Sequence, residues 1–218
     1  EATARAAIAM GNVSKATGER SVAIGSGAEA TQAETIAVGR EAKATAGQTV
    51  AIGRLAKADQ QYATAMGYNA QATGSSSLAL GRDSSSSGSS SVAVGYTNKA
   101  KQNVAVALGV NNDVDGEEST AVGSSNTIAT NANQASVIGR KNKVNRAGSF
   151  VGGFSNVTNG ERNVAVGSEN TTTGEESIGI GTKVIAGTGK TIAIGGVYNP
   201  GGGVEKQTIA RGDDTINP

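Results

Sequence analysis

Residues Ser21 to Gly25 read SVAIG, and residues Thr35 to Gly39 read TIAVG, fourteen positions further along the chain. The same five-residue pattern recurs through the 218-residue sequence and closes each time on a glycine. These glycines are Gly11, Gly25, Gly39, Gly53, Gly67, Gly81, Gly95, Gly109, Gly123, Gly139, Gly153, Gly167, Gly181 and Gly195. Every interval is fourteen residues except the last before Gly139, which is sixteen. Repetition at a short, fixed period predicts a stack of coils in which each coil contacts its neighbours.

The three positions before each glycine predict a β-strand. Large aliphatic residues stand one and three positions before the glycine, as Val22 and Ile24 do, and share one face because side chains alternate with period two. Between them stands a small apolar residue, most often alanine, as at Ala23. A face in water would carry polar side chains, so we expect the strand to be buried on both faces. We assign the aliphatic face to the chain's own core and the alanine face to a close contact with another chain, which predicts a homo-oligomer.

A shorter strand is predicted after each glycine. Four positions on, the residues are mostly polar, as at Lys15 and Lys43, and five positions on they are mostly small and apolar, as at Ala16 and Ala44. This alternation indicates one outward and one inward side chain. Two strands and two turns then make one coil, and successive coils stack as parallel strands. The predicted fold class is all-β, a parallel β-roll or β-solenoid of 14-residue coils.

Composition excludes several classes of function. The chain has no His and no Cys, so the usual general base, thiol nucleophile and zinc ligands are missing. We therefore expect no enzyme activity, no catalytic residues, no cofactor and no metal site. Nineteen basic and eighteen acidic residues give a net charge of +1, and we interpret the cations as dispersed along the chain. We therefore expect no nucleic-acid partner and no direct membrane contact by this segment.

The position after the glycine carries Arg or Tyr on five consecutive coils. These residues, which we call the Arg/Tyr column, are Arg40, Arg54, Tyr68, Arg82 and Tyr96. Arg and Tyr are enriched at binding hot spots, so the column is the candidate ligand-binding site. The alternative is that these side chains stack on one another or bridge to a neighbouring subunit.

A second column changes along the chain. Six consecutive coils carry asparagine at one offset, where earlier coils carry alanine; the asparagines are Asn98, Asn112, Asn126, Asn142, Asn156 and Asn170. Their amides are expected to form a ladder between coils, and the two halves of the stack are expected to differ in shape. The two extra residues before Gly139 predict a bulge near Thr130 to Asn133.

Two shorter motifs carry less weight. Arg211, Gly212 and Asp213 spell an integrin-binding tripeptide, but three-residue matches arise easily by chance. The acidic pairs at 117–118 and 175–176 lack the spacing of a calcium-binding loop. We interpret these pairs as solvated charges in turns.

The repeat units resemble the head repeat of trimeric autotransporter adhesins, the YadA-like surface proteins of Gram-negative bacteria. The units that carry the resemblance are SVAIG and TIAVG, quoted above, together with SVAVG at Ser91 to Gly95, NVAVG at Asn163 to Gly167 and TIAIG at Thr191 to Gly195. The resemblance covers residues 8 to about 196. It implies a left-handed parallel β-roll and an intertwined homotrimer at the bacterial cell surface, anchored in the outer membrane through segments outside this sequence.

The resemblance also implies the partners and the domain organisation. Members of the YadA-like family bind host extracellular-matrix proteins such as collagen, fibronectin or laminin, or host receptors such as CEACAM glycoproteins. Residues 1–196 would form the head repeats, and residues 197–218 a loop and partial strand leading towards a neck. The usual neck pattern is degenerate here, which weakens that last assignment.

Two other functions fit the same repeats. The chain is also compatible with a passive spacer in a surface fibre, because a spacer needs the same core columns. An ice-binding solenoid is a weaker alternative, suggested by a column of threonines at Thr17, Thr31, Thr45 and Thr73. That column continues as Ser87, Lys101, Asp115 and Ala129, which breaks any regular match to an ice lattice.

Overall fold

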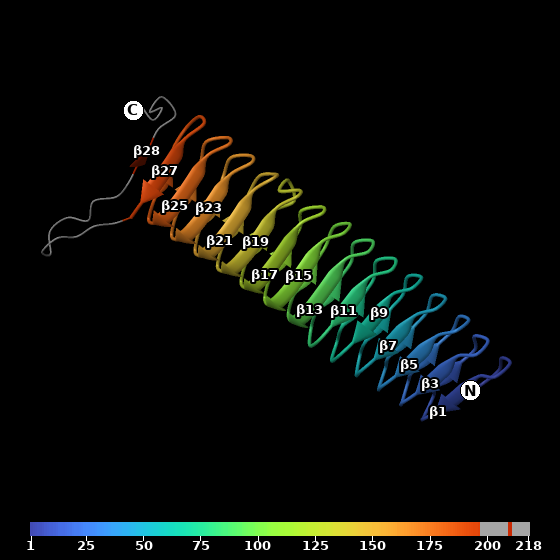
Figure 1. The fold of residues 1–218 in the computed structure, drawn as a ribbon. Coiled ribbons are helices and arrows are strands. Elements are labelled where there is room, and N and C mark those ends of the chain that lie inside the picture. The colour runs from blue at the N-terminus through green and yellow to red at the C-terminus, as the bar shows by residue number, and fades with distance from the viewer. Residues whose placement is uncertain (197–208, 211–218) are drawn as a thin grey trace, which may run out of the picture. The chain divides into compact units, whose positions relative to one another are not determined.

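The computed structural model describes residues 1–196 and 209–210, and its regular elements are all β-strands. The chain divides into two compact units, Glu1–Asn111 and Asn112–Pro218. Each unit is a parallel β-solenoid whose coils contain one longer and one shorter strand (Figure 1). Within the part of the chain that is described, no helix is long and apolar enough to cross a membrane. The predicted all-β parallel solenoid with coils of about 14 residues is therefore confirmed.

In the first unit the longer strands form one parallel sheet and the shorter strands form another. The longer strands are β1 (Ile8–Met10), β3 (Val22–Ile24), β5 (Ile36–Val38), β7 (Val50–Ile52), β9 (Thr64–Met66), β11 (Leu78–Leu80), β13 (Val92–Tyr96) and β15 (Val106–Val110). The shorter strands are β2 (Lys15–Ala16), β4 (Glu29–Ala30), β6 (Lys43–Ala44), β8 (Lys57–Ala58), β10 (Gln71–Ala72), β12 (Ser85–Ser86) and β14 (Lys99–Ala100). Paired residues lie one repeat apart, as Ala23 and Ala37 do.

The second unit repeats this arrangement. Its longer strands are β17 (Thr120–Ser124), β19 (Ser136–Arg140), β21 (Phe150–Phe154), β23 (Val164–Ser168), β25 (Ile178–Thr182) and β27 (Ile192–Gly195). Its shorter strands are β16 (Asp113–Val114), β18 (Thr127–Ile128), β20 (Lys143–Val144), β22 (Val157–Thr158), β24 (Thr171–Thr172), β26 (Ile185–Ala186) and β28 (Ile209–Ala210). The Arg211 to Asp213 tripeptide and most of the predicted approach to a neck lie outside the described residues.

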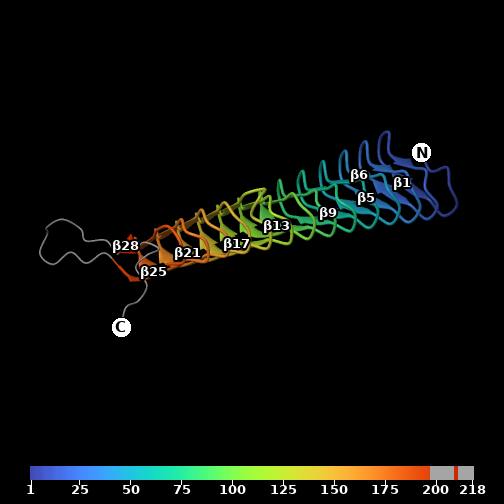
Figure 2. The same ribbon diagram turned by 90° about the horizontal axis from the view of Figure 1, so that it is seen from above.

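In the first unit, the space between the two sheets is filled mainly by small side chains, whereas the second unit also buries larger ones such as Val114, Ile128 and Val144. In the coil around Gly39, four side chains point inward and are 0% exposed: Thr35, Ala37, Ala42 and Ala44. The predicted contact of the alanine column with another chain is therefore wrong, because this column lines the chain's own interior. In the first unit, residues close to alanine in size therefore fill most of the gap between the two walls of a coil. Figure 2 shows the turns of successive coils aligned in rows within each unit.

The large aliphatic side chains point the other way. They lie on the outer side of the longer strands, where Ile36 is 38% exposed, Leu80 is 39% exposed and Ile138 is 52% exposed. We call this outward-facing aliphatic surface of the longer strands the apolar face. Its assignment to the core of the chain is wrong, because these side chains point outward, whereas the small residues between them point into the interior. In the single chain, these side chains are only partly covered.

The repeated glycine is required by the close stacking of coils. Gly67 has φ of 131°, a backbone conformation that residues with a side chain rarely adopt. A Cβ atom added there would lie 2.5 Å from the carbonyl oxygen of Gly81 in the next coil. Both the backbone angle and the lack of space therefore select glycine, which explains why this column defines the repeat.

The asparagine column forms the predicted ladder. Within the second unit, Asn126 Nδ2 donates to Asn112 Oδ1 at 2.9 Å, and Asn142 Nδ2 donates to Asn126 Oδ1 at 3.1 Å. The longer strands from β1 to β11 have three residues, whereas those from β13 to β25 have five. The lengthening coincides with the start of the asparagine column at Asn98, and the expected difference in shape between the two halves stays a prediction.

The sixteen-residue coil contains the predicted bulge. Residues 130–134 lie mainly in turns, and the Ala132 backbone nitrogen donates to the Ala129 carbonyl at 2.9 Å. Strand register is restored directly afterwards, because Ala121 pairs with Val137 and Gly123 pairs with Gly139. The two extra residues are therefore absorbed in one turn and do not disturb the stacking of the longer strands.

Candidate ligand-binding surface

The Arg/Tyr column lies in the first unit, directly after the glycine that ends each strand pattern. Its side chains stack across neighbouring coils: the guanidinium of Arg54 lies 5.6 Å from the centroid of the Tyr68 ring. The guanidinium of Arg82 lies 5.8 Å from the Tyr68 ring and 5.4 Å from the Tyr96 ring. Such cation–π contacts each contribute about 0.5–1 kcal/mol at exposed sites. The prediction that these side chains stack on one another is confirmed for these four residues.

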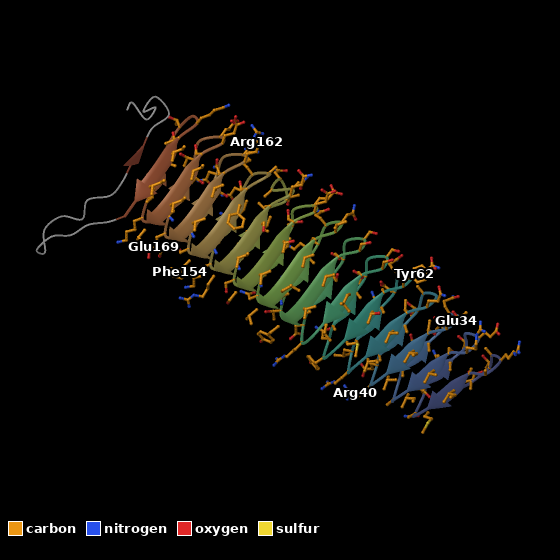
Figure 3. The ribbon with its side chains drawn as sticks, viewed as in Figure 1. Glu34, Arg40, Tyr62, Phe154, Arg162 and Glu169 are labelled. Atoms are coloured by element: carbon orange, nitrogen blue, oxygen red, sulfur yellow. The ribbon has the colours of Figure 1, made fainter. Side chains whose placement is uncertain are left out.

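Arg40 differs from the other members of the column. Its guanidinium pairs with the Glu41 carboxylate of its own turn at 3.2 Å. Arg82 also has an acidic neighbour, because its Nε lies 3.1 Å from Asp83 Oδ2. In Figure 3, Arg40 lies on one edge of the longer strands, and Glu34 and Tyr62 lie on the opposite edge. Ligand binding by the column stays a prediction, and its edge position suits it to that role.

The column borders the apolar face. In β13, Val92, Val94 and Tyr96 are two residues apart, so their side chains point to the same side of the sheet. Tyr68 is 42% exposed and Tyr96 is 44% exposed despite their contacts with arginine. The surface that results combines aliphatic groups, aromatic rings and guanidinium donors, which is the composition of a protein-binding hot spot.

The shorter strands of the first unit carry a groove of about 440 Å³. Its lining residues are Gly27, Glu29, Glu41, Lys43, Leu55, Lys57, Asn69 and Gln71. Glu29 lies between Lys15, at 4.0 Å, and Lys43, at 3.4 Å, and Lys57 pairs with Asp59 at 2.7 Å. The charges of the groove therefore neutralise one another, and its lining contains no nucleophile beside a general base.

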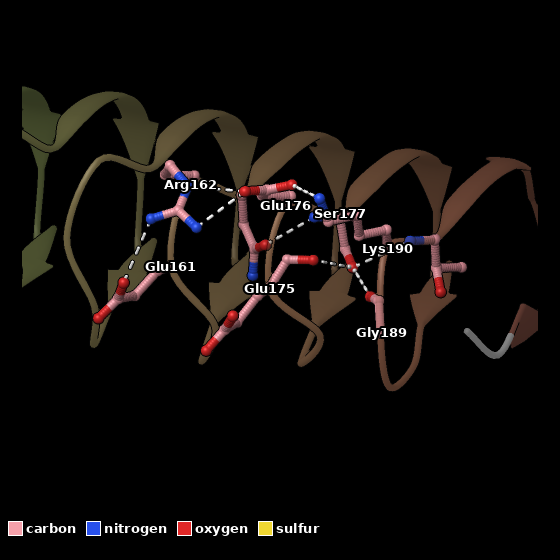
Figure 4. A network of polar contacts seen from close by, with 9 residues as sticks. Glu161, Arg162, Glu175, Glu176, Ser177, Gly189 and Lys190 are labelled. Carbon is pink, nitrogen blue, oxygen red and sulfur yellow. Dashed lines mark hydrogen bonds and ion pairs between the residues drawn. The ribbon is translucent and has the colours of Figure 1, made fainter. Parts of the chain in front are cut away.

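An ionic cluster lies at a turn of the second unit (Figure 4). The Glu176 carboxylate accepts from Lys190 at 2.6 Å and from Arg162 at 2.8 Å. The hydrogen bond from Lys190, followed by that from Arg162, lowers the pKa of Glu176 below its usual value. The hydrogen bond to Glu176 correspondingly raises the pKa of Arg162. These contacts stabilise adjacent turns, and they explain the Glu175 and Glu176 pair as turn charge.

Metal binding finds no support in the described residues. Nowhere in residues 1–196 do three or more carboxylate, imidazole or thiol groups come together in a way that could hold an ion. The other acidic pair also has protein partners, since Glu118 accepts from Gln134 at 3.0 Å.

A family model for the YadA head domain repeat, which describes two copies of the repeat, matches the chain six times. The matched ranges are 2–28, 30–56, 58–84, 72–98, 86–112 and 105–126. Together they cover more than half of the sequence. The chain belongs to the YadA head family. YadA-like heads are parts of autotransporter adhesins, which are displayed on the cell surface and are non-enzymatic in kind. No curated protein sequence matches this YadA head significantly.

One charged cluster of this YadA head escaped the sequence interpretation. Arg140, Lys141, Lys143 and Arg146, which we call the basic coil, place four cations within seven residues. The interpretation of the cations as dispersed is therefore wrong for this segment. The signal was available in the sequence as a local count, but the near-zero net charge of the whole chain concealed it.

Proposed function

We propose that this chain is the head of a trimeric autotransporter adhesin that attaches a Gram-negative cell to host ligands. The observation that carries the proposal is the apolar face of repeats that belong to the YadA head family. Soluble monomers rarely expose contiguous apolar patches larger than a few hundred Å². Three chains packed around one axis through this face would cover it in a closed assembly. The number of chains, their intertwining and the left-handed winding follow from the likeness to the family.

In this proposal the Arg/Tyr column is the ligand-binding edge of the head. The ligands are host matrix proteins, namely collagen, fibronectin or laminin, or host receptors such as CEACAM glycoproteins. Arginine and tyrosine supply donors and rigid aromatic area, and the contacts between Arg54, Tyr68 and Arg82 reduce the ordering that binding requires. The head acts at the bacterial cell surface, and segments outside this sequence supply the anchor in the outer membrane.

A passive spacer is the second candidate, and one specific observation favours it. The stacked side chains of the column already interact with one another, and the guanidinium of Arg40 is paired with Glu41. A column that only stiffens the coils needs no ligand. The two functions share the same fold and differ in whether the exposed edge captures a host protein.

Two measurements test the proposal. Light scattering should give three times the chain mass of 21.5 kDa, and a folded particle of one chain mass would refute the assembly. An array of collagen, fibronectin, laminin and CEACAM ectodomains should then capture the head. The double variant Arg54→Ala/Tyr68→Ala should lose at least tenfold in affinity for the captured ligand. The matched control is Arg20→Ala/Tyr62→Ala, on the other turn. Capture of none of these proteins, or equal loss in both variants, would leave the spacer as the function.

A further inference from the structure

The basic coil lies in the second unit and places four cations along one exposed stretch of chain, which we call the cationic track. The side chains of all four residues are exposed. Arg140 ends β19, Lys141 occupies a left-handed turn with φ of 59°, and Lys143 begins β20 with its side chain on the outer face. Arg146 follows after β20 in the next turn. The five residue steps from Lys141 to Arg146 span at most about 17 Å, which is long enough to contact several anionic groups of one polymer.

The neighbouring coils place no acidic residue in register with Arg140 or Lys143, and Arg140 is paired with Ser124 and Phe154. Lys143 is in register with Thr127 of the preceding coil and Val157 of the following coil. The backbone nitrogen of Lys141 donates to the carbonyl of Ser124, at 2.9 Å, in the preceding coil. Because parallel strands lie about 4.8 Å apart, these residues are the nearest lateral neighbours of Lys141 and Lys143. The local surface is therefore positive and is bordered by hydroxyl and short apolar side chains.

Several other cations of the chain have an acidic partner. Lys43 and Arg162 each have a carboxylate on an adjacent coil, Glu29 at 3.4 Å and Glu176 at 2.8 Å. In contrast, within the described residues none of the four cations of the basic coil lies within 4 Å of a carboxylate. Like charges this close repel one another over a screening length of about 8 Å at physiological salt. An anionic ligand would relieve that repulsion.

Arg140 is held in a defined orientation. Its guanidinium lies 4.7 Å from the centroid of the Phe154 ring in the next coil. The contact limits the motion of the guanidinium plane and leaves its edge free to donate two parallel hydrogen bonds to one anion. Arg140 occupies one face of the Phe154 ring, which reduces the aromatic surface on which a nucleic-acid base can stack.

We propose that the basic coil binds a linear sulfated polysaccharide. Sulfate groups match the arginine fork and the lysine ammonium groups, and short runs rich in Lys and Arg are typical of heparin-binding patches. Polar side chains next to the track suit sugar hydroxyls, as with Asn145, whose Nδ2 donates to Asn159 Oδ1 at 2.6 Å. Binding to a membrane surface is disfavoured, because among the shorter strands whose burial the structure describes no large aliphatic or aromatic side chain is exposed beside Lys143 for insertion between lipids.

The test compares two triple variants of the whole chain that remove equal charge. The first is Lys141→Gln/Lys143→Gln/Arg146→Gln, and the second is Lys15→Gln/Lys43→Gln/Lys57→Gln, whose lysines are ion-paired. Each lowers the net charge from +1 by three, to −2. The probe is a fluorescently labelled heparin oligosaccharide, and binding is followed by fluorescence anisotropy. We expect at least a tenfold loss of affinity in the first variant and less than a twofold loss in the second.

Further readouts make the outcome decisive. The slope of log affinity against log salt should fall by about two to three in the first variant, because each released counterion contributes roughly one. The single variant Lys143→Gln, which should lose about threefold, replaces the triple variant if circular dichroism shows that the latter is unfolded. The proposal would be overturned if both triple variants lost equal affinity for heparin, or if the first lost none. It would also be overturned if the unmodified chain bound desulfated heparin or a single-stranded oligonucleotide as tightly as heparin. Arg54→Ala/Tyr68→Ala should keep heparin binding, which separates this site from the Arg/Tyr column.

Discussion

Replacement of Asn142 by alanine tests the contribution of the asparagine ladder. Asn142 Nδ2 donates to Asn126 Oδ1 at 3.1 Å and to the Gly153 carbonyl at 2.9 Å. Its Oδ1 accepts from the backbone nitrogen and the Nδ2 of Asn156, each at 3.0 Å. Four hydrogen bonds are lost, each with a net value of about 1 kcal/mol. Some of the former partners keep a second bond, whereas the Asn156 backbone N–H loses its only acceptor in the ladder. We therefore expect a loss of about 3 kcal/mol.

Two assays measure this loss. Denaturant titration followed by circular dichroism gives the global effect, and amide hydrogen exchange gives the local one, which matters because long repeat arrays do not always unfold in a single step. The exchange of the Asn156 amide should accelerate most. Asn145→Ala is the control, since Asn145 stands in the same coil but its side chain bonds only to Asn159 at the surface. A loss below about 1 kcal/mol in Asn142→Ala, or an equal loss in the control, would refute the reasoning.

Three further predictions concern the turns. Gly67→Ala should destabilise the chain by about 3 kcal/mol or more in denaturant titration, because the new Cβ would lie 2.5 Å from the carbonyl oxygen of the next coil. Gly47→Ala should be nearly neutral in the same assay, because a Cβ at that position meets nothing within 4 Å. Val104→Asn should raise the free energy of unfolding by about 0.5–1 kcal/mol, because Val104 has φ of 56°, which asparagine tolerates better. The Glu176 carboxyl should titrate below 4.5 in an NMR experiment. The stabilisation from Lys190 is therefore present above that pH and is lost as the pH falls through the folded-state pKa. A pKa at or above 4.5 would contradict the ion pair.

The period and the strands were predictable because their causes are local. Gly67 and its equivalents need a backbone angle and a space that glycine alone provides, so their spacing fixes the length of the coil. The alternation of Val22, Ala23 and Ile24 then determines which side chains share a face. Neighbouring coils pair in register, so the adjacency of Arg54 and Tyr68 also followed from the column alone.

The direction of the core was not predictable from that alternation. A strand with apolar residues on both faces fits either orientation, and the usual rule that large aliphatics fill the core gave the wrong answer. The exposed fractions decide the orientation, because Ala23 is 0% exposed and Ile24 is 36% exposed. The ion pair between Arg40 and Glu41 was also not predictable from the sequence, because the same arginine could pair with Glu41 or stack on a neighbour of the column through a change of side-chain conformation alone.

The reversed placement of large and small side chains links folding of the chain to its assembly. Alanines such as Ala37 and Ala44 are fully buried, yet each removes little apolar area from water, so a lone coil gains little from its core. Ile36 is still 38% exposed in the single chain, so covering it and its equivalents on the apolar face would add about a third of the roughly 1.5–3 kcal/mol that full burial of such a side chain contributes. In the proposed trimer this gain is realised only when sister chains meet. Changes in the inner columns should therefore disturb the coil itself, whereas changes on the apolar face should first weaken the association between chains.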